Sequence, residues 1–189
     1  MLFRSYYRPD EHSPTQTWPA MIAVVTDLNG RITGAHRTYL APPGMDSSAD
    51  GKATIDTPRR AMGDLLGNAV RFGIGGEVMA AGEGIETVLS LRQAVPSMPM
   101  LAALSAAHLA AILFPGTLRR LYIVRDNDPA GNGARDTLIE RANATGIEAI
   151  VISPELDDFN EDLRTLGLAN VERYSWKRSA QTVSQLIDE

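Results

Sequence analysis

The stretch YIVRDNDPAG, residues 122–131, places two aspartates directly after three apolar residues. Tyr122, Ile123 and Val124 indicate a buried strand, and Asp126 and Asp128 stand one residue apart where that strand leaves the core. The proline and glycine that follow suit the first turn of a helix. The two carboxylates therefore either cap a helix or hold a cation at the end of a strand.

Strand-like and helix-like runs alternate around this stretch. We expect parallel strands at 77–81, 99–103, 121–125 and 148–152, with helical patterns between them. This alternation predicts an α/β fold, with a four-stranded parallel sheet covered by helices on both faces. Upstream, two β-rich runs around Asn29-Gly30 predict a separate antiparallel β-hairpin over residues 20–40.

The chain is thus expected to have three parts. Residues 1–75 form an N-terminal extension with the hairpin and a loop, residues 76–168 form the α/β domain, and residues 169–189 form a helical tail. Residues 41–57 are rich in proline, glycine, serine and aspartate, which predicts a mobile loop.

Composition excludes several classes of protein. The 189 residues include no cysteine, which rules out disulfides, thiol catalysis and cysteine-based zinc sites, and which fits a cytoplasmic location. No apolar run is long enough to span a bilayer, so no membrane partner is expected. The net charge of −5 argues against a strongly basic nucleic-acid coat. It does not exclude nucleic acid, because carboxylates that hold metal ions make a site acidic.

Acidic residues follow three of the expected strands. Glu83 stands between Gly82 and Gly84 after the first strand, Asp126 and Asp128 follow the third, and the acidic run 155–162 follows the fourth. Ligands of open α/β sheets bind at the carboxyl ends of strands, so the first two groups converge if their strands are neighbours.

Clustered carboxylates of this kind favour Mg²⁺ (or Mn²⁺) as a cofactor. Carboxylates packed together repel each other unless a cation neutralises them. Mg²⁺ takes oxygen ligands and is usually held by one or two carboxylates together with substrate phosphates. For Asp128 the alternative is a helix N-cap, and for the acidic run it is a helix start.

Three segments resemble a known family. In order, GEGIETVLSL, YIVRDNDPAG and DDFNEDL are similar to the three motifs of the Toprim domain, as found in phage- and plasmid-type DNA primases. The resemblance covers roughly residues 20–168 and implies the Toprim fold for the α/β domain.

The resemblance also implies roles for individual residues. Glu83 matches the general acid/base or metal ligand, and Asp126 and Asp128 match the metal-binding aspartates. Gly131 matches the glycine of the same motif. The pattern KDFND aligns with the third segment and makes Asp158 a metal ligand; Asp157, however, stands where that pattern usually has lysine.

Phosphate contacts are expected from a further set of residues. Arginine favours phosphate, and a glycine lets phosphate approach the backbone closely. The candidates are Arg59, Arg60, Gly84, Arg125, Gly131 and Asn160. For Arg59 and Arg60 the alternative is a solvated charge pair, and for Arg125 it is compensation of the nearby negative charge.

Together these observations predict a metal-dependent primase that joins nucleoside triphosphates on single-stranded DNA during phage or mobile-element replication. A Toprim nuclease, and an inactive module that binds nucleic acid or a partner, are the alternatives. Primases of this kind usually carry a zinc-binding module and often a helicase, which a second chain could supply here.

Overall fold

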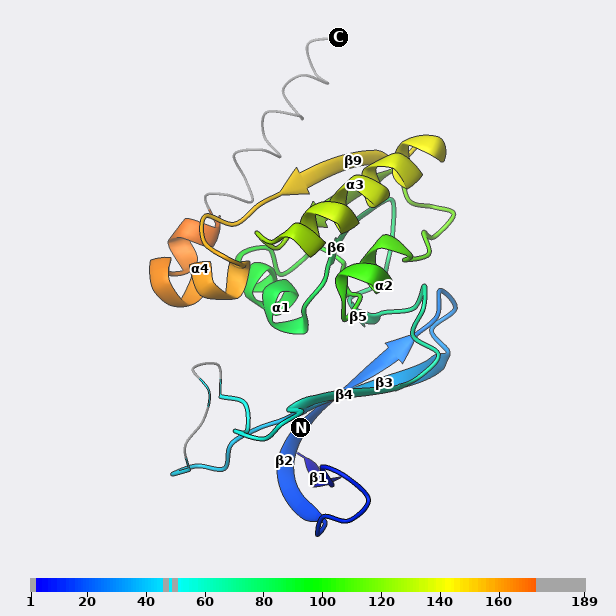
Figure 1. Ribbon diagram of the computed structural model, residues 1–189. Coiled ribbons are helices and arrows are strands. Elements are labelled where there is room, and N and C mark those ends of the chain that lie inside the picture. The colour runs from blue at the N-terminus through cyan, green and yellow to red at the C-terminus, as the bar shows by residue number, and fades with distance from the viewer. Residues whose placement is uncertain (1–2, 46–47, 49–50, 173–189) are drawn as a thin grey trace. The chain divides into compact units, whose positions relative to one another are not determined.

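The computed structural model describes residues 3–45, 48 and 51–172, and it divides into two compact units, Met1–Leu65 and Leu66–Glu189 (Figure 1). Each unit has its own sheet, and each is described by itself. Most of the expected helical tail lies beyond residue 172 and therefore outside the described residues.

The first unit is a four-stranded antiparallel sheet in the order β1-β2-β3-β4. Its strands are β1 (Phe3–Tyr7), β2 (Gln16–Thr26), β3 (Ile32–Tyr39) and β4 (Arg59–Gly63). The turn between β2 and β3 depends on Asp27, whose carboxylate accepts the backbone N–H groups of Asn29 and Arg31 at 2.8 and 2.9 Å. Gly30 has a φ of +77°, which a glycine adopts without strain. The predicted hairpin is confirmed, and two further strands extend it.

The segment from residue 51 to residue 57 packs onto this sheet. Ala53 is buried against Tyr7, Ala20 and Tyr39, and the rings of Tyr7 and Tyr39 meet edge to face with centroids 5.3 Å apart. The prediction of a mobile loop over 41–57 is therefore wrong for this part, because an alanine between polar residues gives no sequence signal of its burial.

The second unit holds a five-stranded sheet in the order β5-β7-β6-β8-β9. Its strands are β5 (Val70–Phe72), β6 (Val78–Gly82), β7 (Met100–Ala102), β8 (Arg120–Val124) and β9 (Glu148–Ile152). β6 to β9 are parallel, which confirms the four predicted strands. β5 adds an antiparallel edge strand that pairs with β7.

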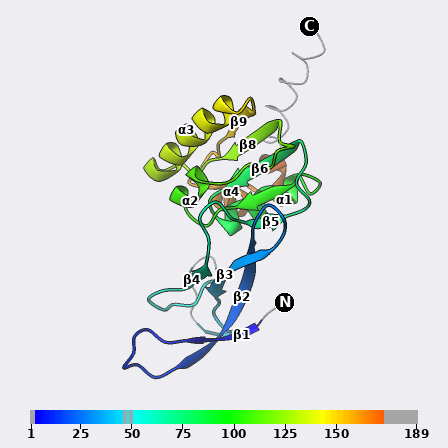
Figure 2. The same cartoon turned by 90° about the vertical axis from the view of Figure 1, so that its right-hand side faces the viewer.

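Helices cover both faces of this sheet, as Figures 1 and 2 show. They are α1 (Ile85–Ala94), α2 (Ala106–Ala110), α3 (Pro129–Ala144) and α4 (Phe159–Leu166). α2 and α3 lie together on one face, where Leu121 and Ile123 of β8 join their buried core. On the other face α1 packs against β6 and β7, and α4 packs against α1.

The order in which successive strands join the sheet reverses between β6 and β8. From β6 the chain passes through α1 to β7 on one side of the sheet order, and from β8 it passes through α3 to β9 on the other. The carboxyl ends of β6 and β8 thus flank a topological switch point, the usual position of ligands in such sheets. Among the described residues, no helix is long and apolar enough to cross a membrane.

Candidate active site

Glu83 and Asp126 emerge side by side at this switch point. β6 and β8 are neighbours, and the last residues of the two strands, Gly82 and Val124, are partners in their register. Glu83 follows Gly82 directly, and Asp126 stands two residues after Val124. The first and third predicted strands are therefore neighbours in the sheet. Their pairing brings the two acidic motifs to the same edge of the sheet.

The carboxyl group of Asp126 is strongly perturbed by its surroundings. Burial raises its pKa to about 7, with additional contributions from the charges of Glu83, Asp158 and Asp128. A hydrogen bond with Thr87 acts in the opposite direction. The Oδ1 atom of Asp126 is buried and has no hydrogen-bond partner within the described part of the chain. A buried carboxylate oxygen surrounded by other carboxylates is an environment that a cation would stabilise.

Asp128 and Asp158 occupy equivalent positions at the starts of two helices. Asp128 is the N-cap of α3 and accepts the Gly131 N–H at 2.6 Å, while Asp158 is the N-cap of α4 and accepts the Glu161 N–H at 2.7 Å. The capping alternative is thus correct for both residues. It does not exclude metal binding, because a carboxylate has about four lone-pair positions and each cap uses one.

At two glycines of the motifs, a larger side chain would come close to a neighbouring atom. A Cβ on Gly131 would lie 2.5 Å from the backbone oxygen of Asp126, so only glycine lets the first turn of α3 approach this loop. A Cβ on Gly84 would lie 3.2 Å from Thr87 Oγ1. Gly84 is also the N-cap of α1, and it offers no side chain to cap that helix. Phosphate binding by both glycines stays a prediction.

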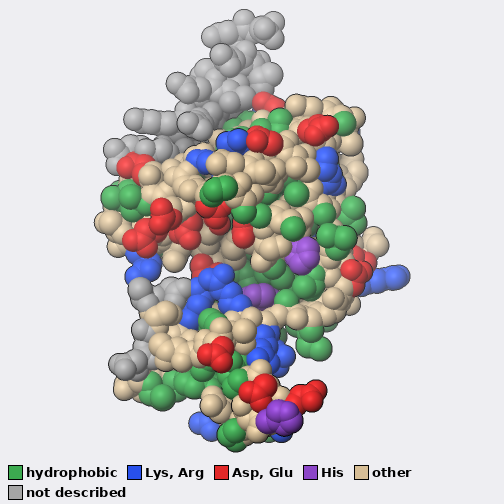
Figure 3. All heavy atoms as spheres, in the orientation of Figure 1, with side chains coloured by type: hydrophobic (Ala, Val, Ile, Leu, Met, Phe, Trp, Pro, Cys, Tyr) green, Lys and Arg blue, Asp and Glu red, His purple; other side chains and the backbone are tan. Residues whose placement is uncertain are grey.

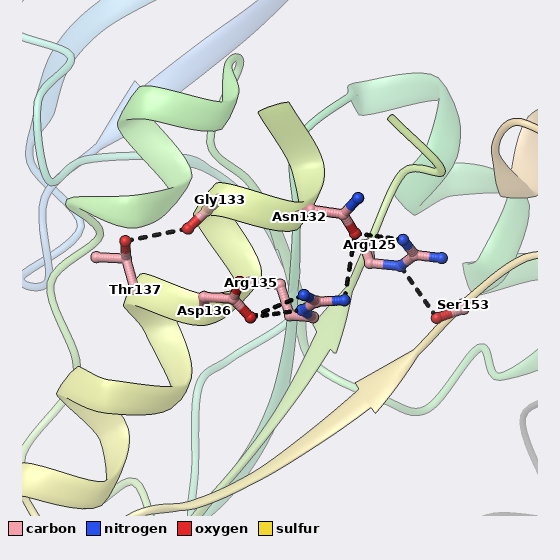
Figure 4. Close-up of polar contacts among 7 residues, drawn as sticks. All are labelled: Arg125, Asn132, Gly133, Arg135, Asp136, Thr137 and Ser153. Carbon is pink, nitrogen blue, oxygen red and sulfur yellow. Dashed lines mark hydrogen bonds and ion pairs between the residues drawn. The ribbon is translucent and has the colours of Figure 1, made fainter. Parts of the chain in front are cut away.

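Arg125 is tied into the protein by its whole guanidinium group. Nε donates to Ser153 Oγ at 3.2 Å, and the terminal nitrogens donate to the side-chain oxygens of Asn127 and Asn132. Figure 4 shows that Arg135 of α3 reaches the same Asn132 oxygen. Contact of Arg125 with phosphate stays a prediction, and its observed contacts are structural.

The remaining predicted phosphate ligands lie in two places. Asn160 lies in the first turn of α4 and accepts a hydrogen bond from Ser90 of α1 at 3.4 Å. Arg59 and Arg60 belong to β4 of the first unit. The Arg60 guanidinium stacks over the Tyr7 ring at 4.6 Å and donates to the Arg8 carbonyl at 3.0 Å, so it has structural contacts of its own.

Sequence reasoning missed Asp162. Its side chain is only 1% exposed, and its two carboxylate oxygens accept the backbone N–H groups of Glu155 and Leu156 at 2.9 and 2.8 Å. Asp162 therefore holds the loop between β9 and α4. An acidic residue in the first turn of a helix, after a loop, is a signal that could have indicated such a role.

The carboxylates of the site suit a Mg²⁺ ion that takes only some of its ligands from the protein. In the described ranges, no group of three or more Asp, Glu, His or Cys side chains is arranged to hold a metal ion. Mg²⁺ usually takes only one or two carboxylates and completes its shell with waters and substrate phosphates. Figure 3 shows acidic side chains gathered on the visible face of the second unit in the region of α4. The carboxylates around Asp126 fit this mode of binding.

Two family models match the chain, one in each half. Residues 78–169 match the Toprim domain, and residues 2–72 match a domain of unknown function (DUF7146). No curated protein matches the sequence.

Solved structures with the same fold include three primases. The primase fragment of the bacteriophage T7 primase-helicase has a TM-score of 0.62 at 14% identity, and the match covers 84% of this chain. The Aquifex aeolicus primase, with its zinc-binding and RNA polymerase domains, has a TM-score of 0.56 at 17% identity over 89% of this chain. The RNA polymerase domain of Mycobacterium tuberculosis primase, solved with double-stranded DNA, has a TM-score of 0.53 at 16% identity over 88% of this chain.

The chain spans only part of these proteins, namely 64% of the T7 fragment, 43% of the Aquifex protein and 56% of the mycobacterial domain. At these identities the similarity establishes the fold, and the match of the family model establishes the domain. Residues 78–169 are therefore a Toprim domain, within a chain whose fold is that of DNA primase fragments.

Proposed function

We propose that this protein is a Mg²⁺- or Mn²⁺-dependent nucleotidyltransferase of the primase type. It joins nucleoside triphosphates on a single-stranded DNA template, in the cytoplasm, during replication of a phage or mobile element. The observation that carries the proposal is the buried Oδ1 of Asp126, which has no hydrogen-bond partner among the residues described and is subject to the charges of Glu83, Asp158 and Asp128 at the switch point of the sheet.

The proposed ligands of the cation are Asp126 and Asp128, together with Glu83 or Asp158. When bound there, the cation would neutralise the triphosphate and lower the pKa of the attacking 3′ hydroxyl. By holding the cation, the carboxylates would position the triphosphate indirectly, since Mg²⁺ is usually bound by one or two carboxylates together with substrate phosphates. Partial burial of Asp126 lowers the local dielectric constant and strengthens its attraction for a cation.

Glu83 is the proposed proton acceptor. It stands directly before the N-terminus of α1, whose backbone N–H groups and helix dipole favour negative charge nearby. The N-termini of α3 and α4 point the same kind of partial positive charge toward Asp128 and Asp158. The three helices thus place their partial positive charge beside carboxylates at this edge of the sheet.

A specific observation favours a second function, that of an inactive module which binds nucleic acid or a partner. Asp157 stands where the resembling motif has lysine, and this replaces a positive charge near the proposed phosphates with a negative one. Asp157 also has a structural role, because its carbonyl accepts the Asn127 N–H at 2.8 Å. This backbone contact does not depend on the identity of the side chain.

The partners follow from the similar proteins. The T7 fragment comes from a primase-helicase, and the Aquifex protein carries a zinc-binding domain. We propose that this chain acts together with a zinc-binding module or a helicase. Single-stranded DNA and nucleoside triphosphates are the proposed substrates.

The test is an incubation with labelled nucleoside triphosphates, single-stranded DNA and Mg²⁺ or Mn²⁺. Labelled oligonucleotides that require the divalent ion would support the primase proposal. Cleavage of the DNA would instead identify the nuclease alternative. DNA binding without either product, in the presence of both ions and over a series of templates, would identify the inactive module.

A further inference from the structure

We propose that Asn127, the middle residue of the Asp-Asn-Asp motif, is a positioning residue that sets the place of Asp158 relative to Asp126. The inference rests on the proposed metal site and adds to it a residue that touches no metal ion or substrate. It follows from the hydrogen bonds that join the loop after β8, residues 125–128, to the loop after β9, residues 153–158.

Asn127 makes three hydrogen bonds between the two loops. Its backbone N–H donates to the Asp157 carbonyl at 2.8 Å. Its side-chain Nδ2 donates to the Pro154 carbonyl at 3.2 Å and also to the Leu156 carbonyl. Three carbonyls of one loop are therefore held by a single residue of the other, directly between the two aspartates of the motif.

Arg125 fixes the orientation of the Asn127 amide. The Asn127 Oδ1 accepts a hydrogen bond from the Arg125 guanidinium, and this directs Nδ2 toward the other loop. Arg125 is itself anchored on both sides, to Ser153 Oγ at 3.2 Å and to Asn132 of α3 (Figure 4). Its backbone N–H also continues the pairing with β9, donating to the Ile152 carbonyl at 3.0 Å.

The second loop is also held by Asp162. That carboxylate accepts the N–H groups of Glu155 and Leu156, while Asn127 takes the carbonyls of Pro154 and Leu156. The backbone of the loop thus has its donors and acceptors bound by two different residues. The loop leads directly into Asp158, whose charge acts on Asp126.

Asparagine suits this position because its side chain both donates and accepts. An acceptor is needed for Arg125, and a donor pair is needed for the two carbonyls. An aspartate would lose the donors, and an alanine would lose all of the side-chain contacts. Outer residues that orient metal ligands typically change metal affinity by 10- to 100-fold when they are removed.

The test uses Mn²⁺ alone as the probe, with paramagnetic broadening of backbone amide signals as the readout. In the wild type, Mn²⁺ should broaden the amides around Asp126 and Asp128 together with those around Asp158. In Asn127→Ala we expect the affinity for Mn²⁺ to fall about tenfold, and the amides around Asp158 to lose their broadening first. Arg135→Ala is the matched control, because Arg135 also contacts Asn132 but makes no contact with the loop 153–158 among the hydrogen bonds seen.

The possible outcomes distinguish a failure of the positioning role of Asn127 from a failure of the metal site. If Asn127→Ala broadens both groups of amides at wild-type Mn²⁺ concentrations, the positioning role is overturned while the metal site stands. If the wild type shows no broadening at either loop, the metal site itself fails, and the positioning role fails with it. Should Asn127→Ala not fold, Arg125→Lys decides, because it keeps the charge but loses the fork that orients Asn127; wild-type behaviour of that variant would overturn the proposal.

Discussion

The loops after β8 and β9 carry similar acidic residues but use them differently. At the end of the loop after β9, Asp158 caps α4, and Asp162 in the first turn of α4 accepts two backbone N–H groups of the loop, so the hydrogen bonds of both carboxylates serve the fold. In the loop after β8, Asp128 caps α3, but Asp126 retains a buried oxygen with no hydrogen-bond partner in the described residues. Asp126 is thus the carboxylate whose placement the fold alone does not explain.

The difference predicts the largest effect for Asp126→Asn. The exchange keeps the size of the side chain but removes a proposed metal ligand, and a loss of several kcal/mol in transition-state stabilisation corresponds to roughly 1,000-fold in rate. Primer synthesis in the presence of Mg²⁺ is the measurement, with Asp136→Asn on the exposed side of α3 as the control. Activity within a few fold of the wild type would remove Asp126 from the site.

Asp126→Asn should lower activity, but it should not lower the stability of the metal-free protein. The pKa of Asp126 in the fold is raised to about 7 from its ordinary value of 3.8, so the folded state binds a proton more tightly than the unfolded state. Stability from this group is present in acid and is lost as the pH rises through about 7. Asp126→Asn should remove this loss, so urea denaturation without metal should show the variant at least as stable as the wild type at pH 8.

Asp162→Ala should mainly lower stability, whereas Asp126→Asn should mainly lower activity. It removes the buried carboxylate that accepts the part-buried Glu155 and Leu156 N–H groups, and we expect a loss of about 2 kcal/mol in unfolding free energy. Denaturation in urea measures it. Asp136→Ala, at an exposed position on α3, serves as the control and should change stability by less than about 0.5 kcal/mol. A neutral Asp162→Ala would mean that Asp162 does not organise the loop after β9.

Gly131→Ala tests the close approach of α3 to the loop after β8. The new Cβ would lie 2.5 Å from the Asp126 backbone oxygen, so the helix or the loop must shift, at an expected cost of about 2 kcal/mol. Gly133→Ala is the matched control on the same helix, where a Cβ meets nothing within 4 Å, and it should stabilise by up to about 1 kcal/mol. Equal effects at the two positions would contradict the close approach.

The smallest expected effect on stability is that of Asp128→Asn, which distinguishes helix capping from metal binding at Asp128. Asparagine caps a helix about as well as aspartate, so Asp128→Asn should be nearly neutral in unfolding free energy, whereas Asp128→Ala should cost about 1 kcal/mol. Thermal melts with and without Mg²⁺ complete the test. A Mg²⁺-induced shift of wild-type size in Asp128→Asn would limit Asp128 to its cap.

The sequence predicted the parallel strands because each is a short apolar run, and two of these runs end at Gly82 and Arg125. It did not predict β1 and β4, where charged and exposed residues such as Arg4 and Arg59 interrupt any apolar alternation. The three-residue β5 is too short to give a pattern. Edge strands of this kind are defined by pairing with a neighbour, which a local reading of the sequence does not contain.

For the site, the sequence predicted which carboxylates lie after neighbouring strands. It did not predict which hydrogen bonds each of these carboxylates makes. Asp126 and Asp128 look equivalent in the motif, yet one is half-buried and the other is an exposed cap. The role of Asn127 depends on carbonyls almost 30 residues further along the chain, which come within reach only because β8 and β9 are paired. Contacts of this range follow from the topology and leave no local signal.

The most direct test of the central claim is the titration of the Asp126 carboxyl group by NMR, with and without Mg²⁺. Without Mg²⁺ the carboxyl should titrate near its raised pKa of about 7, because burial and three neighbouring carboxylates oppose its ionisation. Saturating Mg²⁺ should lower that pKa, since a bound cation favours the charged form. A carboxyl that titrates at its ordinary value, and that Mg²⁺ leaves unchanged even when nucleotide is present, would contradict the metal site on which the proposed function depends.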